Sequence, residues 1–260
     1  GLALALLATL WVLSWRQSRM YTDIERLYQT TIERNPRCWM AHNNLGLVLY
    51  NAGRVPDSVA QFDEALQLWP HFAPIQYNMA NALRRLGQFP QAIPYFQESV
   101  RLCPGFIDAH YDLGITLAAV GRLNEAVAEY QEALRLCPEY PEAHYNLAIA
   151  LCRLDRFSEG IGHFQEALRQ RPDYPEAHYN LGVAFTATGR MDEAIVQYQE
   201  ALRLNPQLAD AHNNLGSALC QLGRFSQAVP HFQEALRLRP DYPQARKNLE
   251  MATQALRQGQ

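Results

Sequence analysis

A carboxamide or carboxylate recurs at one position of the sequence, directly before a repeated Leu or Met and 34 residues from the next copy. The column consists of Asn44, Asn78, Asp112, Asn146, Asn180, Asn214 and Asn248. A carboxamide has two hydrogen-bond donors and an acceptor, so it can pair with the N–H and C=O groups of an extended peptide without reading its side chains. We call these residues the asparagine column, and they predict peptide binding.

An aromatic column stands one position earlier, at Tyr77, Tyr111, Tyr145 and Tyr179. A tyrosine ring has an apolar body and a polar tip, which suits a contact surface beside the amides. Two alternatives stay open at this stage. The amides could bond neighbouring helix backbones, and the tyrosines could pack between adjacent helices.

The elements that carry these columns follow from the rest of the 34-residue period. From Ala177, apolar and small residues recur at the i, i+3, i+4 spacing of a helix face, and the pattern resumes after Gly189. Glycine can end the first helix with a positive φ, and a proline stops the second. The period therefore predicts pairs of helices that must stack to bury their apolar faces, with closing prolines at Pro70, Pro104, Pro138, Pro172, Pro206 and Pro240.

These residues resemble the tetratricopeptide repeat (TPR), whose pattern has L-G, a later Ala, an aromatic, Ala and a terminal Pro. The resemblance implies an all-α, right-handed superhelical TPR solenoid of antiparallel helix pairs, in which the first helices line a concave groove that the asparagine column faces. It also implies an asparagine ladder like that of O-GlcNAc transferase TPRs, which grips peptide backbones. Asp155 and Gly160 depart from the pattern and predict local loosening. The expected repeats span 39–72, 73–106, 107–140, 141–174, 175–208 and 209–242.

The two ends of the chain differ from the repeats. Residues 16–38 fit the second helix of a partial repeat, and residues 243–260 fit a polar C-terminal capping helix. Residues 1–15 are apolar throughout, with Trp11 and Trp15 before Arg16 and Arg19, which predicts the end of a transmembrane helix. The alternative is a buried first helix of the partial repeat. This end resembles the TPR tail of polytopic membrane glycosyltransferases of the transmembrane O-mannosyltransferase type.

Composition and motifs exclude several functions. The net charge of −3 and a single lysine, Lys247, argue against nucleic acid as a partner. No catalytic constellation, phosphate loop or metal-spaced pair occurs, so we expect neither an enzyme nor a cofactor or metal. The histidines of the repeats recur about 8–10 Å apart if helices stack, too far to share an ion, which predicts packing residues with satisfied ring nitrogens: His42, His110, His144, His178 and His212.

The expected function is a protein-interaction module that holds a protein or extended peptide in an Asn-lined groove. Two alternatives remain: a substrate-presenting accessory domain of a membrane-bound protein glycosyltransferase, and an assembly scaffold that uses its convex face. We expect membrane association. Five cysteines without metal or disulfide spacing, together with Arg16 and Arg19, favour the cytoplasmic side, whereas the family resemblance implies the lumenal or periplasmic side.

Overall fold

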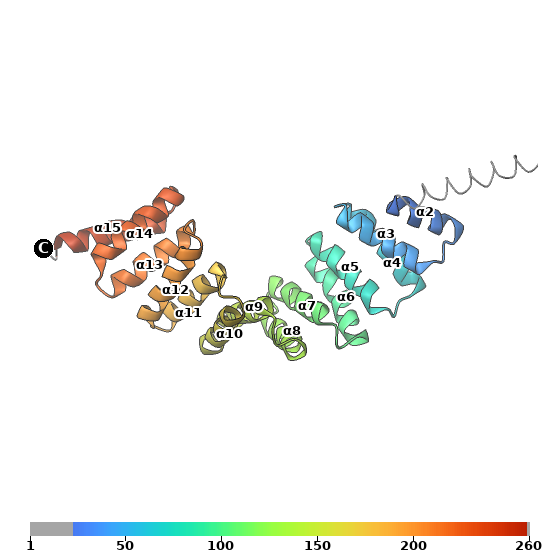
Figure 1. The fold of residues 1–260 in the computed structure, drawn as a ribbon, viewed down its shortest axis with the longest axis horizontal. Coiled ribbons are helices and arrows are strands. Elements are labelled where there is room, and N and C mark those ends of the chain that lie inside the picture. The colour runs from blue at the N-terminus through green and yellow to red at the C-terminus, as the bar shows by residue number, and fades with distance from the viewer. Residues whose placement is uncertain (1–22, 259–260) are drawn as a thin grey trace, which may run out of the picture. The chain divides into compact units, whose positions relative to one another are not determined.

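The computed structural model describes residues 23–258, and every regular element in this range is an α-helix (Figure 1). The predicted all-α fold is confirmed. The chain divides into two compact units, the second of which begins at Leu123, inside the expected repeat 107–140. The helices of unit 1 are α2 (Ile24–Arg34), α3 (Trp39–Asn51), α4 (Val55–Leu68), α5 (Ala73–Arg85), α6 (Phe89–Leu102) and α7 (Ile107–Ala119).

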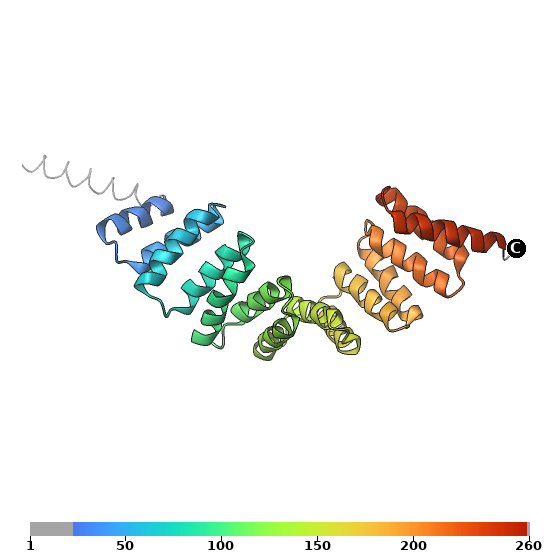
Figure 2. The same cartoon turned by 180° about the vertical axis from the view of Figure 1, so that it is seen from behind.

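In unit 2, 14-residue and 13-residue helices alternate as far as α14, and α15 has 16 residues. Within each unit, consecutive helices follow one another in single file, and the second helix of a pair packs against the first helix of the next (Figures 1 and 2). The helices of unit 2 are α8 (Leu123–Leu136), α9 (Pro141–Arg153), α10 (Phe157–Gln170), α11 (Pro175–Ala187), α12 (Met191–Leu204), α13 (Ala209–Gln221), α14 (Phe225–Leu238) and α15 (Pro243–Gln258).

The turn inside each pair is set by one residue with a positive φ. Gly189 has φ 76°, and the next N–H, that of Arg190, donates to the Phe185 carbonyl at 2.9 Å. This closure satisfies a carbonyl at the helix end and needs the left-handed conformation that glycine adopts without strain. Proline in the first turn of α11 removes an N–H that has no partner inside the helix, so it starts the helix without cost.

Helices of a pair approach closely because an aromatic ring lies on a glycine. A Cβ added at Gly182 of α11 would lie 2.6 Å from the Tyr198 ring of α12, and one at Gly46 of α3 would lie 2.5 Å from Phe62. Both rings are buried, Tyr198 at 1% exposure and Phe62 at 0%. The repeated L-G pair therefore marks a close helix crossing in which the ring takes the place of a side chain.

The expected loosening of the repeat at 141–174 is not what the structure shows. Asp155 adopts φ 59°, and the N–H of Arg156 donates to Leu151 at 3.0 Å, the same closure that Gly189 permits one repeat later. Asp tolerates this left-handed conformation better than most residues. Gly160 also has a packing role, because a Cβ there would lie 2.6 Å from the Cys152 Sγ. Both departures are accommodated without shortening α9 or α10.

The ends of the described region bear on the remaining expectations. α15 packs against α14 and buries Ala245 and Ala252, whereas Lys247 and Glu250 are exposed. The segment expected at residues 1–15, and the start of the partial repeat, lie outside the described residues. Among residues 23–258, no helix has both the length and the hydropathy of a membrane span.

Candidate functional site

The asparagine column lies along the first helices, one residue on each of α3, α5 and α7 in unit 1 and one on each of α9, α11, α13 and α15 in unit 2. We call the side of these helices that carries the column the first-helix face. Asn44, Asn78, Asn146, Asn180, Asn214 and Asn248 are half-buried, and Asp112 is buried at 9% exposure.

In unit 2 the structure brings the asparagine and tyrosine columns together. The Asn180 Nδ2 donates to the Tyr145 Oη at 3.0 Å, and the Asn214 Nδ2 donates to the Tyr179 Oη at 3.2 Å. Each bond joins a first helix to the preceding first helix, 35 residues earlier. The amide nitrogens therefore bond neighbouring helices, as the alternative expected, but through side chains rather than through the backbone.

Where the preceding repeat has asparagine instead of tyrosine, the same cross-helix bond forms between two amides. The Asn78 Nδ2 donates to the Asn43 Oδ1 at 2.9 Å in unit 1, and the Asn248 Nδ2 donates to the Asn213 Oδ1 at 3.0 Å in unit 2. The cross-helix bond thus forms at the same repeat position in each case, because a tyrosine hydroxyl or an asparagine oxygen there can accept the hydrogen bond.

The bonded amides keep part of their hydrogen-bonding capacity. The Asn180 Nδ2 uses its second hydrogen on the Glu176 carbonyl at 3.0 Å, while the Asn180 Oδ1 has no hydrogen-bond partner among the described residues. The Asn78 Oδ1 is likewise without a partner in that part of the chain. In each unit the asparagine column therefore presents a half-buried amide oxygen that can accept an N–H.

The tyrosine rings are packed rather than free. The Tyr77 ring lies 4.8 Å from the Phe106 ring and 5.9 Å from the Phe96 ring, and Tyr145 stands 4.8 Å from Tyr174, measured between ring centroids. Burial raises the pKa of Tyr145 to about 12, so its hydroxyl is neutral at physiological pH. These rings fill the space between helices, as the packing alternative expected, while Tyr111 is half-buried.

Unit 1 has a charged cluster where the column carries a carboxylate. The Tyr77 Oη donates to the Asp112 Oδ2 at 2.7 Å, and the Arg84 Nη2 lies 3.1 Å from the Asp112 Oδ1. Burial raises the pKa of Asp112, and the nearby Arg84 charge opposes that rise. The same Arg84 nitrogen donates to the Asn81 Oδ1 at 2.8 Å, so the cluster is fixed from two helices.

Two equivalent hollows open on the first-helix face, one in each unit. The unit 1 hollow has a volume of about 270 Å³ and the unit 2 hollow about 230 Å³. Their lining residues correspond at a separation of three repeats, which places Leu47 with Ile149, Phe62 with Phe164, and Asn78 with Asn180. Each hollow therefore lies beside one of the two unpaired amide oxygens.

The sequence interpretation placed Val183 at a groove position but missed Asn81. Asn81 lines the unit 1 hollow and Val183 takes the equivalent place in unit 2, three positions after the column residue. Residues at i and i+3 share a helix face, so this spacing could have identified Asn81. Arg84, a further three residues along α5, lines the unit 1 hollow only.

Family models cover most of this helical architecture. Models described as tetratricopeptide repeat match residues 15–71 and 145–209, and residues 73–106 and 209–242, and a model described as TPR repeat matches residues 116–155. The chain belongs to the tetratricopeptide repeat family. No curated protein sequence matches this TPR chain, and the likeness to O-GlcNAc transferases and to membrane mannosyltransferases stays a prediction.

Solved structures share the fold of this TPR protein. YrrB, described as a TPR protein with an unusual peptide-binding site, gives a TM-score of 0.63 at 23% identity over 71% of this chain and 95% of YrrB. MamA gives 0.60 at 26% identity over 62% of this chain and 94% of MamA. PilF of Pseudomonas aeruginosa gives 0.67 at 16% identity over 80% of this chain and 95% of PilF. These likenesses support the TPR arrangement of helix pairs.

The histidine column of the TPR protein has a structural role that the sequence predicted. The His178 Nε2 lies 3.2 Å from the Pro172 carbonyl oxygen, and its Nδ1 lies 2.8 Å from the Gln197 side-chain oxygen. His144 instead faces a second imidazole, with 3.0 Å between its Nδ1 and the His163 Nδ1. Among the described residues, no three His, Cys, Asp or Glu side chains form a metal-binding group.

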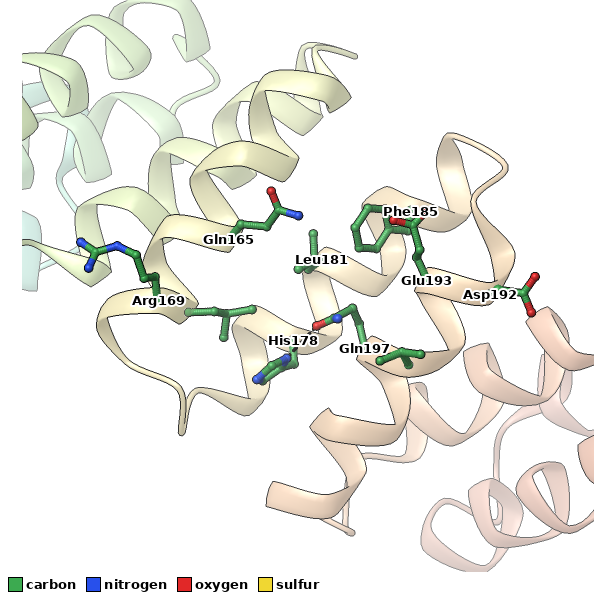
Figure 3. A pocket seen from close by; sticks show the side chains of 10 residues that line it. Gln165, Arg169, His178, Leu181, Phe185, Asp192, Glu193 and Gln197 are labelled. Carbon is green, nitrogen blue, oxygen red and sulfur yellow. Dashed lines mark hydrogen bonds between the residues drawn. The ribbon is translucent and has the colours of Figure 1, made fainter.

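A larger hollow of about 570 Å³ lies between the second helices α10 and α12, over α11 (Figure 3). Leu168, Leu181 and Phe185 give it an apolar lining, and Val196 at its edge is 57% exposed. Arg169 and Glu193 lie at the hollow and are each paired, with Glu166 and Arg190 respectively. We call this the outer hollow, since its lining includes no residue of the asparagine or tyrosine column, although His178 lines it.

Proposed function

We propose that this TPR protein is a protein-interaction module that binds an extended polypeptide segment along its first-helix face. The observation that carries the proposal is the repeated pairing of an unpaired amide oxygen with a hollow, Asn78 in unit 1 and Asn180 in unit 2. An amide oxygen can accept a backbone N–H, and a hollow beside it can receive the side chain of a neighbouring residue.

The size of the hollows supports a peptide over a small molecule. Pockets for drug-sized ligands measure about 300–1,000 Å³, and the hollows of 270 and 230 Å³ lie below that range. The unit 2 hollow is lined mainly by apolar residues such as Ile149, Val183 and Phe164, a surface suited to one apolar side chain, and Arg153 and Asn180 also line it. The edge of the same face carries acids whose charge is already paired, as Glu142 is with Arg171 at 2.6 Å.

The test uses variants that distinguish the proposed ligand-binding role of the Asn180 oxygen from the structural hydrogen bond of the Asn180 nitrogen. Tyr145→Phe removes the bond between Tyr145 and Asn180 but leaves the Asn180 oxygen in place, whereas Asn180→Ala removes both. Peptides would be selected from a phage-displayed library of linear 12-residue sequences and measured by fluorescence anisotropy. We expect Asn180→Ala to weaken binding about tenfold, as the loss of one hydrogen bond to a buried partner predicts, and Tyr145→Phe to change it far less.

The outer hollow favours a second candidate, a scaffold that binds partners on the second helices. Val196→Asp would place a charge on that exposed apolar edge without touching either column. If the peptides bind Val196→Asp normally and bind Asn180→Ala weakly, the first-helix face is the binding surface. The reverse pattern, or equal losses in Tyr145→Phe and Asn180→Ala, contradicts the proposal.

A further inference from the structure

The two hollows share a frame but differ in chemistry. Three repeats apart, the unit 2 positions hold Val183, Thr186 and Asn214 where unit 1 holds Asn81, Arg84 and Asp112. In unit 1 all three polar residues line the hollow, whereas in unit 2 only Val183 does. At these three equivalent positions, the unit 1 hollow has a polar lining and the unit 2 hollow has an apolar one.

The charges of the unit 1 hollow cancel. The Arg84 guanidinium lies 3.1 Å from the Asp112 carboxylate, and their side chains are only 28% and 13% exposed. A charged side chain entering this hollow would lose hydration without an uncompensated opposite charge to receive it, which is costly. The hollow therefore favours a neutral polar group over a carboxylate or an ammonium.

Two residues that line the hollow also have a donor and an acceptor without a partner among the described residues. Arg84 uses its Nη2 on Asp112 and Asn81, and its Nη1 makes no hydrogen bond with any described residue. The Asn78 Oδ1 is the unpaired acceptor. A primary carboxamide complements both, because its oxygen can accept from Arg84 while its NH₂ donates to Asn78.

The walls of the hollow select the longer carboxamide. Leu47 and Tyr50 of α3 also line the hollow and add apolar surface to it. A glutamine has one more methylene than an asparagine, and burying a methylene contributes about 0.8 kcal/mol. Resting on the proposed function, we infer that the unit 1 hollow is a specificity pocket for a glutamine side chain of the bound segment.

The test exchanges the pocket chemistry with residues that the chain itself uses. The triple variant Asn81→Val, Arg84→Thr, Asp112→Asn gives unit 1 the residues found at 183, 186 and 214. Wild type and variant would each be used to select 12-residue peptides from a phage-displayed library, with the helical content of both checked by circular dichroism. We expect wild type to enrich glutamine at one peptide position and the triple variant to enrich an aliphatic residue there.

Single peptides then measure the preference. Replacing the enriched glutamine by glutamate or leucine should weaken binding to wild type about tenfold, as the loss of one hydrogen bond predicts, and leucine should bind the triple variant at least as well as glutamine. If wild type selects glutamate or an aliphatic residue, or if the glutamine preference survives in the triple variant, the inference of a glutamine pocket is wrong but the proposed function is not affected. A wild-type selection that enriches no peptide contradicts the proposed function as well.

Discussion

The Asn180 amide donates to the Tyr145 hydroxyl, 35 residues earlier, and this single bond links two first helices on their shared face. Asn180 thus contributes to stability through its nitrogen and is available to a ligand through its oxygen. The two roles use different atoms, so substitutions can separate them.

A double-mutant cycle measures the structural part. Tyr145→Phe removes only this bond and should lower the free energy of unfolding by about 1 kcal/mol, whereas Asn180→Ala also removes the bond to the Glu176 carbonyl and should cost more. The double variant should cost little more than Asn180→Ala alone, with a coupling energy of about 1 kcal/mol. Urea unfolding of the four proteins gives the value, and simple additivity would show that the bond contributes nothing.

Two histidine pairs predict a loss of stability in acid. Burial lowers the pKa of His163 and of His231, and the facing His144 and His212 lower them further, although Glu159 and Glu166 oppose this at His163. As the pH falls through about 6.5, these imidazoles become protonated in the unfolded chain but stay neutral in the folded chain. Stability is therefore full above pH 6.5 and falls as the pH drops below it, by up to about 1.4 kcal/mol per pH unit for each site.

The chain contains its own control for these pairs. The repeat at 175–208 has Gln197 where its neighbours have His163 and His231. His163→Gln should flatten the decline in unfolding free energy between pH 7.5 and 5.5, and Gln197→His should steepen it. Urea titrations at each pH provide the measurement, and a decline unchanged in both variants would assign the acid sensitivity to other groups.

Asp155 occupies a turn position that glycine holds at 189 and 223. Asp155→Gly removes the strain of a side chain at φ 59°, and the greater freedom of glycine in the unfolded chain offsets part of that gain. We expect a net stabilisation of about 0.5 kcal/mol, and a destabilisation of about 1 kcal/mol for Gly189→Asp. Thermal unfolding measures whether each variant is stabilised or destabilised. A stabilising Gly189→Asp would contradict the idea that the positive φ of this turn favours glycine.

Gly182 gives room to the Tyr198 ring, which is also fixed by a 3.0 Å hydrogen bond to Thr186. Gly182→Ala should cost about 1–3 kcal/mol through overpacking, although alanine is the better helix former. The cost should be smaller in a Tyr198→Phe background, because the ring loses its bond to Thr186 and can shift away, as in the preceding repeat, which has Phe164 with Ala148 at the glycine position. Denaturant unfolding, with and without Gly182→Ala in the wild-type and Tyr198→Phe backgrounds, measures the two costs. An equal cost in the two backgrounds contradicts this mechanism.

The fold was predictable because each of its requirements recurs. Gly189, the buried Tyr198 and the terminal Pro206 each report a turn, a core position or a helix end, and the 34-residue period repeats the same information in every copy. Asp155 was the misleading exception, since its left-handed backbone depends on the closure from Arg156 to Leu151 rather than on the residue type alone.

The site was predictable only in part. The position of Asn180 on the first-helix face follows from spacing, but the occupation of its nitrogen by Tyr145 depends on the offset between consecutive helices, which spacing does not give. The hollows depend on side chains from several helices, and in unit 1 Leu47, Phe62, Asn81 and Asp112 come from α3, α4, α5 and α7. Such convergence across repeats has no signature within a single period.

The contact between a first-helix side chain and the proline carbonyl six residues upstream recurs with different chemistry. His178 makes it with Pro172, while Gln76 makes it with Pro70 at 2.8 Å and Arg246 with Pro240 at 3.1 Å. The proline closes one repeat and its partner stands in the first helix of the next, so every repeat supplies one half of this contact at each of its ends. Copies could then be gained or lost during evolution without any compensating change at the new junction.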